Sequence, residues 1–194
     1  MTPAHRLAAA GLLLALVACT TPTVVNYLTL TTTPQGVVRK DAAPIGIGPI
    51  TLPDYLKRNG LARRDSEGAL HYSTTELWAE PLDSGIQRTL IETLSDALGD
   101  TPVLAFPGLS SIKPQYQITV SVRRLTARPA AVEMSATWRI IPIAASTADP
   151  VRTGQFRGDR TLTSPSGTAI ARALSELVNA LALDVANAIP AQSG

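Results

Sequence analysis

Residues 116–124 read YQITVSVRR and residues 133–141 read EMSATWRII, and these two stretches decide the predicted fold. In each of them apolar and polar residues alternate, which is the pattern of a strand with one buried face and one polar face. The connection over residues 125–132 is short and contains Pro129, so we expect the two strands to pair as an antiparallel hairpin. The residues expected to face the core are Tyr116, Ile118, Val120, Val122, Met134, Ala136, Trp138 and Ile140.

Two amphipathic helices are predicted, one before this hairpin and one after it. The first runs from Pro81 to Gly99, because proline suits the first helical turn and glycine suits the position just past the end. The second begins at Ser166 or Thr168 and runs to about Ala188. Each helix has one apolar side. The apolar residues are Leu82, Ile86, Leu90, Ile91, Leu94, Ala97 and Leu98 in the first helix, and Ile170, Leu174, Leu177, Val178, Leu181, Val185 and Ala188 in the second.

Further strands are predicted over residues 24–30, 44–53, 70–72 and 154–162. The stretch 44–53 (PIGIGPITLP) is apolar with alternating glycines, and its prolines favour an edge strand or interrupted pairing. Strands do not alternate one-to-one with helices along the chain, so the predicted fold class is α+β. We expect a single, mostly antiparallel sheet with the two amphipathic helices packed on one face.

The N-terminal residues predict an exported, lipid-anchored protein. The apolar stretch from Leu7 to Val17 is shorter than the roughly 20 residues that a membrane-spanning helix needs, and it has the length of a secretory signal core. Ala18 directly before Cys19, the only cysteine, resembles the lipobox of bacterial lipoproteins, in which the cysteine becomes the first mature residue and carries acyl chains. Thr20 follows where many inner-membrane lipoproteins carry aspartate. By resemblance to the sorting rule of enteric bacteria, the expected location is the outer membrane, facing the periplasm.

These signals divide the chain into a cleaved signal peptide over residues 1–18, a lipidated cysteine and tether over 19–23, one periplasmic α+β domain over 24–190 and a tail over 191–194. The mature chain carries 16 Lys and Arg against 15 Asp and Glu. This near-neutral balance without a basic cluster excludes a nucleic-acid partner. The isolated pairs Arg63–Arg64 and Arg123–Arg124 are interpreted as solvated surface. With its cysteine lipidated, the domain is expected to be stabilised by packing without a disulfide.

The residues that could carry catalysis are few. His71 is the single histidine of the mature chain, it lies in a short alternating stretch, and no G-x-S-x-G motif accompanies it. Glu76 and Glu80 flank Trp78 and could form a carboxylate pair for glycoside hydrolysis. A carboxylate beside Pro81 at a helix start is, however, expected for its interaction with the helix dipole. No spacing of ligands predicts a metal site, and the sequence is interpreted as that of a non-enzyme.

Two segments carry a family resemblance. IGIGPITLPDYLKR, residues 45–58, and WAEPLDSGI, residues 78–86, are similar to two blocks of the PqiC-like lipoproteins. The stretch 27–30 (YLTL) resembles the strand that follows the lipidated cysteine in that family. From Tyr116 onward only the strand-strand-helix pattern agrees. Lys57 stands where aspartate is common in the family. These lipoproteins are auxiliary components of ABC-type and MCE-type lipid transport systems.

The resemblance implies a docking role in lipid transport across the periplasm. The implied partners are the membrane, an MCE-domain periplasmic protein and an inner-membrane permease, and a homo-oligomeric ring would suit a tubular partner. No cofactor is expected beyond the covalent lipid on Cys19. The proposed partner-binding residues are Ile45, Gly46, Ile47, Gly48, Pro49, Leu52, Pro53, Tyr55, Leu56 and Trp78.

Alternatives remain for this surface and for the function. An incompletely paired strand over residues 45–58 could accept a partner strand, or its glycines could simply permit close packing of a helix across the sheet. Tyr55 and Trp78 could be interface anchors or ordinary core residues. The competing functions are a lipid carrier with its own apolar cavity and a structural lipoprotein of another envelope complex.

Overall fold

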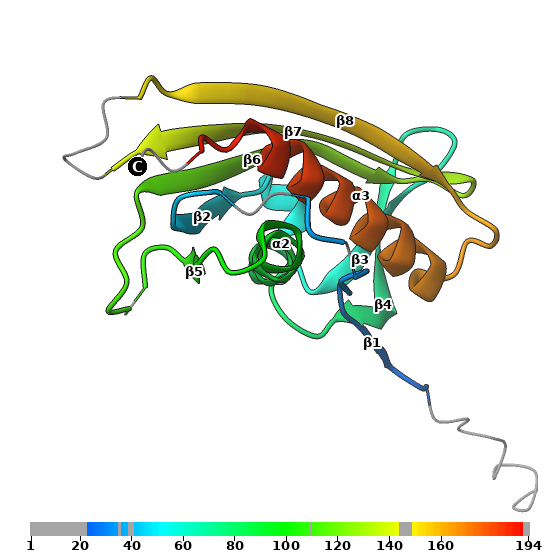
Figure 1. The fold of residues 1–194 in the computed structure, drawn as a ribbon. Coiled ribbons are helices and arrows are strands. Elements are labelled where there is room, and N and C mark those ends of the chain that lie inside the picture. Colours follow the sequence, from blue (N-terminus) through cyan, green and yellow to red (C-terminus); the bar gives the residue numbers. More distant parts are fainter. Residues whose placement is uncertain (1–22, 35, 39–40, 109, 144–148, 192–194) are drawn as a thin grey trace, which may run out of the picture.

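The computed structural model describes residues 23–34, 36–38, 41–108, 110–143 and 149–191. Figure 1 shows a curved sheet with two helices beneath it and a smaller group of strands at one end. In chain order the elements are β1 (Asn26–Leu28), β2 (Ile45–Thr51), the 3-10 helix η1 (Asp54–Leu56), β3 (Gly60–Arg64), β4 (Leu70–Trp78), α2 (Leu82–Leu98), β5 (Val103–Ala105), β6 (Tyr116–Ala127), β7 (Ala131–Pro142), β8 (Arg152–Thr161) and α3 (Gly167–Ala188).

The strands form two sheets, which corrects the predicted single sheet. The larger sheet has the order β5-β2-β6-β7-β8, and the smaller one has the order β1-β4-β3. In the larger sheet β6, β7 and β8 form an antiparallel meander, whereas β2 runs parallel to both of its neighbours. The α+β class is right. The apolar run of β2 is the pattern of a parallel strand buried on both faces, because parallel strands lack the alternation of half-exposed ones.

The predicted hairpin forms the centre of the larger sheet. β6 pairs with β7 along its whole length, and Val120 lies opposite Trp138. All eight residues expected to face the core are buried. The register shifts between Val122 and Arg124, so a β-bulge interrupts the alternation near the end of β6.

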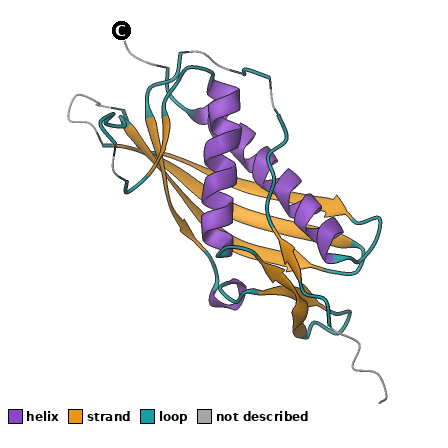
Figure 2. Ribbon diagram, turned by 90° about the horizontal axis from the view of Figure 1, so that it is seen from below, coloured by secondary structure: helices purple, strands orange, loops and turns teal. Residues whose placement is uncertain are grey.

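Both predicted helices are present, and they lie side by side on one face of the larger sheet (Figure 2). α2 is preceded by Pro81 and followed by Gly99, whose φ of 62° lies in the left-handed region that glycine adopts without strain. α3 is capped by Ser166, whose hydroxyl accepts a hydrogen bond from the backbone N–H of Ala169 at 3.2 Å. The threonine hydroxyl of Thr93 on α2 donates to the amide oxygen of Asn179 on α3 at 2.5 Å, in the buried contact between the helices.

The smaller sheet accounts for two of the remaining strand predictions, whereas the predicted strands over 44–53 and 154–162 are β2 and β8 of the larger sheet. The strand expected over residues 24–30 is only β1, and the stretch 70–72 is the beginning of the nine-residue β4. β3 was not predicted. β1 pairs parallel to the end of β4, and β3 pairs with β4 as a hairpin. One continuous apolar core joins both sheets and both helices.

Candidate functional site

The segment predicted to dock a partner begins inside the fold. β2 lies between β5 and β6, and Ile45 and Ile47 are fully buried. A Cβ added at Gly46 would lie 2.9 Å from the Cβ of Phe106. Gly48 has a φ of 127°, and a Cβ there would lie 2.3 Å from the carbonyl oxygen of Phe106. The glycines therefore admit the close approach of the chain that follows β5.

Few of the ten proposed docking residues reach the surface. Pro49 is exposed, Pro53 and Tyr55 are half-buried, and the others are buried, namely Ile45, Gly46, Ile47, Gly48, Leu52, Leu56 and Trp78. A partner could therefore contact this segment directly only near the end of β2. Docking there stays a prediction.

The exposed end of β2 meets the beginning of α2 at a surface hollow of about 230 Å³, which we call the β2–α2 corner. It is lined by Pro49, Ile50, Asp83, Ser84, Gln87, Phe106 and Pro107. The Gln87 side-chain amide donates to the carbonyl oxygen of Ile47 at 2.7 Å, and the backbone N–H of Phe106 donates to the same oxygen at 2.8 Å. The two sequence blocks that carry the family resemblance thus meet here. The hollow is smaller than an ordinary small-molecule pocket, and its size suits a protein side chain.

Tyr55 and Trp78 hold the two sheets together. The Tyr55 hydroxyl donates to the carbonyl oxygen of Leu125 on β6 at 3.0 Å and accepts from the backbone N–H of the same residue at 3.2 Å. The Tyr72 hydroxyl donates to the Tyr55 carbonyl oxygen at 3.0 Å. Trp78 is buried in the common core. These contacts give both proposed anchors a structural role.

The two carboxylates considered for hydrolysis are both engaged in ion pairs. Glu76 lies 2.6 Å from the Arg63 guanidinium and accepts from the Gly167 backbone N–H at 2.7 Å, at the start of α3. The arginine lowers the pKa of Glu76 below its ordinary range, against the opposing effect of partial burial. Glu80 lies 2.6 Å from the Arg88 guanidinium, where the two side chains join α2 to the chain before it. Glu76 thus contacts the first turn of α3, whereas Glu80 contacts an arginine in the second turn of α2.

The remaining candidate side chains in the described part of the chain make contacts within the fold. The exposed His71 lies 2.7 Å from an Asp65 carboxylate oxygen. Within the described ranges, no three His, Cys, Asp or Glu side chains are placed to hold a metal ion. Burial raises the pKa of Tyr116 to about 12, and a hydrogen bond from its hydroxyl to Asp149 adds to the shift. That tyrosine forms part of the buried side of β6.

The cavity within the apolar core is small. A core cavity between the smaller sheet, β6 and α3 has a volume of about 20 Å³, which is the space of one water molecule. Its walls include Leu56, Leu61, Trp78 and Leu174. None of the helices in the described part of the chain has the length and apolarity to cross a bilayer. Ala18 and Cys19 lie outside the described residues, so cleavage and lipidation stay predictions.

Comparison with known proteins identifies relatives in sequence and in structure. The chain is 35% identical over 72 residues to the intermembrane transport lipoprotein PqiC of Escherichia coli, and equally so to that of Shigella flexneri. This alignment covers 37% of the chain and 38% of the relative, so the chain spans well under half the length of these curated relatives.

Two crystal structures share the fold. An uncharacterised protein has a TM-score of 0.69 at 21% identity, covering 85% of this chain and 98% of its own. A protein from Xanthomonas campestris has a TM-score of 0.64 at 14% identity, covering 84% of this chain and 92% of its own. The sequence profile of the family described as "ABC-type transport auxiliary lipoprotein component" matches residues 28–186, nearly all of the folded domain. The chain therefore belongs to the family of ABC-type transport auxiliary lipoprotein components.

Proposed function

We propose that this protein is an outer-membrane-anchored periplasmic lipoprotein that docks an MCE-domain protein of a lipid transport system. The observation that carries the proposal is the family match over residues 28–186. The name of the Escherichia coli relative, an intermembrane transport lipoprotein, supports the same role. The docked protein would connect through the periplasm to an inner-membrane permease.

The position of the predicted anchor supports one orientation of the domain, with its β1 end toward the membrane. Six residues lie between Cys19 and the first residue of β1, and a fully extended chain over these seven steps reaches at most about 25 Å. Val24 and Tyr27 at this end are 71% and 68% exposed. An apolar and an aromatic side chain beside an acylated cysteine suit the interface between lipid and water. The β1 end of the domain would thus lie against the anchoring membrane.

The packing of the core favours docking over carriage of lipid. An acyl chain enclosed by the domain would need a cavity within the 300–1,000 Å³ of ordinary ligand pockets, and the core cavity holds about 20 Å³. The β2–α2 corner instead offers a surface on which a partner protein could dock. It presents Pro49 and Ser84 to solvent around a hollow the size of a side chain.

The proposal is tested by recovery of partners from detergent-solubilised envelopes of cells that produce the tagged protein. The wild type is expected to recover an MCE-domain protein and to fractionate with the outer membrane. Cys19→Ala is expected to lose membrane attachment. Ser84→Arg places a bulky charge in the β2–α2 corner and is expected to lose the partner while keeping the membrane location. Ser121→Arg, the same substitution at an exposed position of β6, is the matched control.

The outcomes separate the competing functions. An unchanged recovery of the partner by Ser84→Arg would move docking away from the corner. Recovery of no transport protein, together with lipid bound to the purified domain, would replace docking by the carrier function.

A further inference from the structure

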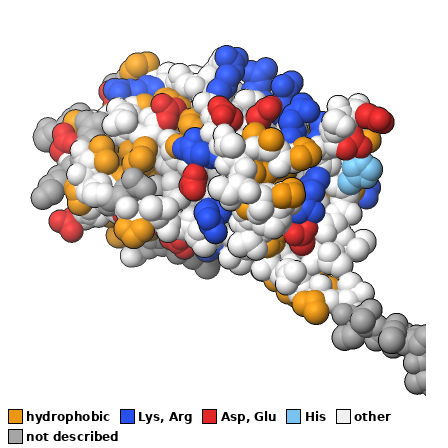
Figure 3. All heavy atoms as spheres, turned by 90° about the vertical axis from the view of Figure 1, so that its right-hand side faces the viewer, with side chains coloured by type: hydrophobic (Ala, Val, Ile, Leu, Met, Phe, Trp, Pro, Cys, Tyr) orange, Lys and Arg blue, Asp and Glu red, His pale blue; other side chains and the backbone are white. Residues whose placement is uncertain are grey.

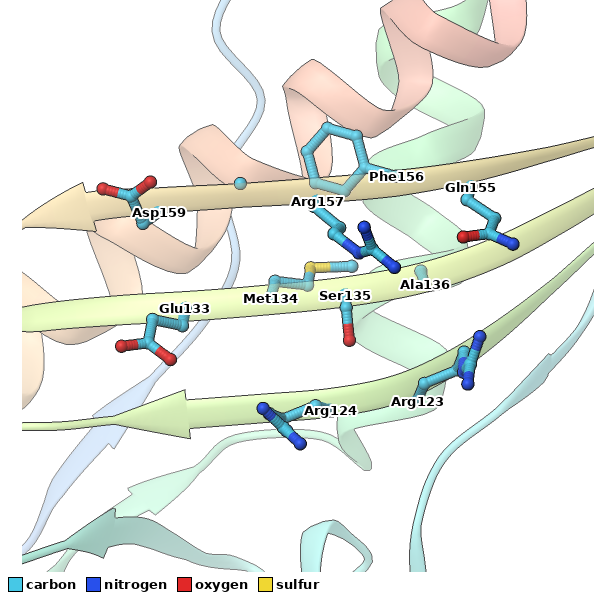
Figure 4. Close-up of a pocket in the computed structure, with 11 residues that line it drawn as sticks. Arg123, Arg124, Glu133, Met134, Ser135, Ala136, Gln155, Phe156, Arg157 and Asp159 are labelled. Atoms are coloured by element: carbon cyan, nitrogen blue, oxygen red, sulfur yellow. The ribbon is translucent and has the colours of Figure 1, made fainter.

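The face of the larger sheet that the helices leave uncovered carries a second hollow. It has a volume of about 480 Å³ and is formed by β6, β7 and β8 (Figure 4). Lys and Arg side chains gather along this side of the molecule, at the top of Figure 3. The volume lies within the range of small-molecule pockets. Neither the family match nor the relatives assign a role to this face.

The β-bulge in β6 gives the hollow its basic character. In a regular strand, consecutive side chains point to opposite faces, so one of Arg123 and Arg124 would point into the core. The register shift between Val122 and Arg124 adds one residue to β6, and both arginines are exposed. Figure 4 shows both of them at the hollow. The bulge therefore doubles the positive charge at this point.

A third arginine completes a row across the three strands. Ser135 on β7 lies opposite Arg124 on β6 and opposite Arg157 on β8. Among the described residues, the guanidinium groups of Arg123, Arg124 and Arg157 have no hydrogen-bond or ion-pair partner. Guanidinium groups bind phosphate oxygens through two parallel hydrogen bonds, and the Ser135 hydroxyl can add another. No carboxylate of the described residues forms an ion pair with this row, so its guanidinium groups can bind an anion from outside the protein.

An acidic pair lies beside the basic row. Glu133 and Asp159 are cross-strand partners, two residues along β7 and β8 from Ser135 and Arg157. Two residues of a strand advance by roughly 7 Å. Glu133 lies 3.6 Å from Arg128, and the Asp159 carboxylate has no ion pair within the described residues. Two like charges directly opposite each other are unfavourable unless a cation lies between them.

We propose that this hollow binds a phosphate ester that carries an ammonium group, the headgroup of an ethanolamine phospholipid. The phosphate lies on Arg123, Arg124 and Arg157, and the ammonium lies between Glu133 and Asp159. The hollow is a surface feature, so the acyl chains stay outside the domain, which agrees with the closed core. The assignment of a membrane lipid as the source of the headgroup rests on the proposed function.

The test measures binding by titration calorimetry on the full chain in neutral maltoside micelles. The probes are O-phosphoethanolamine, glycerol 3-phosphate, inorganic phosphate, and the dihexanoyl forms of phosphatidylethanolamine and phosphatidylglycerol. The variants are Arg124→Gln, Arg157→Gln and Asp159→Asn. Arg139→Gln is the matched control, because Arg139 is exposed on the same face of β7 and does not line the hollow.

The two arginine substitutions are expected to weaken O-phosphoethanolamine binding at least tenfold each, since each removes a charge-assisted hydrogen bond to the phosphate. Asp159→Asn is expected to weaken it several-fold while leaving glycerol 3-phosphate unchanged. Arg139→Gln is expected to change neither by as much as twofold. Dihexanoyl phosphatidylethanolamine is expected to bind at least as tightly as the free headgroup, and more tightly than dihexanoyl phosphatidylglycerol.

Several results would overturn the inference. An equal loss with Arg139→Gln, or the absence of saturable binding, would leave only a diffuse positive surface. The affinities for phosphate, glycerol 3-phosphate and O-phosphoethanolamine could be equal and unchanged by Asp159→Asn. That result would show that the hollow does not bind the ammonium group. Binding of the free headgroup but not of the phospholipid would show that the ligand is a soluble phosphate ester and not a membrane lipid. Recovery of the MCE-domain partner by Arg124→Gln tests the proposed function separately, because that position lies outside the β2–α2 corner.

Discussion

Replacing Gly154 by alanine should destabilise the domain through a clash with one tryptophan. Gly154 on β8 is the cross-strand partner of Trp138 on β7, and the indole ring covers the space where a side chain would be. A Cβ at this position would lie 2.1 Å from Cζ2 and 2.3 Å from Cε2 of the ring. Distances this short require the indole to move. The ring is also fixed from the other side, because its N–H donates to an Asp184 carboxylate oxygen on α3 at 2.7 Å.

The expected loss combines two effects. Overpacking of a tightly packed site costs about 1–3 kcal/mol, and losing a hydrogen bond to a charged group adds roughly 1.5–3 kcal/mol. A total of about 2.5–6 kcal/mol corresponds to a fall in Tm of roughly 5–25 °C for a domain of this size. The substitution should also change the wavelength of maximum fluorescence emission of Trp138, because it reduces the contact between β8, β7 and α3. Trp138 is one of two tryptophans in the chain.

The assay is thermal and urea unfolding followed by tryptophan fluorescence and circular dichroism. Gly36→Ala is the matched control, since a Cβ there meets nothing within 4 Å, and its Tm should lie within about 2 °C of the wild type. In a Trp138→Phe background the cost of Gly154→Ala should fall by at least half, because the phenyl ring is smaller and has no N–H. A full-sized cost in that background, or none in the wild type, would refute the clash as the cause.

Two further substitutions test buried polar contacts. Asn179→Ala should lower the free energy of unfolding by about 1–3 kcal/mol in urea titrations, because the Thr93 hydroxyl loses its buried acceptor, while Asn187→Ala on the exposed side of α3 should change it by less than about 0.5 kcal/mol. Arg63 lowers the pKa of Glu76 below its ordinary 4.5, so the stabilisation by this carboxylate is complete above pH 4.5 and is lost as the pH falls through the lowered pKa. Glu76→Gln should therefore reduce the fall in Tm on acidification below pH 4.5, and a Tm profile parallel to that of the wild type would contradict this assignment.

The sequence predicts those elements whose pattern is local. The β6–β7 hairpin and both helices follow from periodicity and capping residues, and the structure confirms each of them. The smaller sheet has no such pattern. The middle of β4, residues 73–76, reads STTE and contains no apolar residue to set an alternation. Its strand conformation depends on pairing with β3 and with residues 26–28, some 50 positions away. Long-range pairing of this kind is not encoded in a single stretch, so two sheets were not predicted.

The arginine-lined hollow on β6, β7 and β8 was likewise not predicted from the sequence. The sequence predicts Arg123 and Arg124 as solvated surface, and both are exposed. The bulge that turns both side chains to the same face cannot be located from the sequence. Their partner Arg157 lies 33 positions beyond Arg124 and meets it only through the register of three strands. Several other arginines near the surface form ion pairs. Arg160, three residues along β8 and on its other face, lies 3.1 Å from Glu176. Three unpaired guanidinium groups in one hollow repel one another, and this repulsion lowers the cost of binding a phosphate that neutralises them.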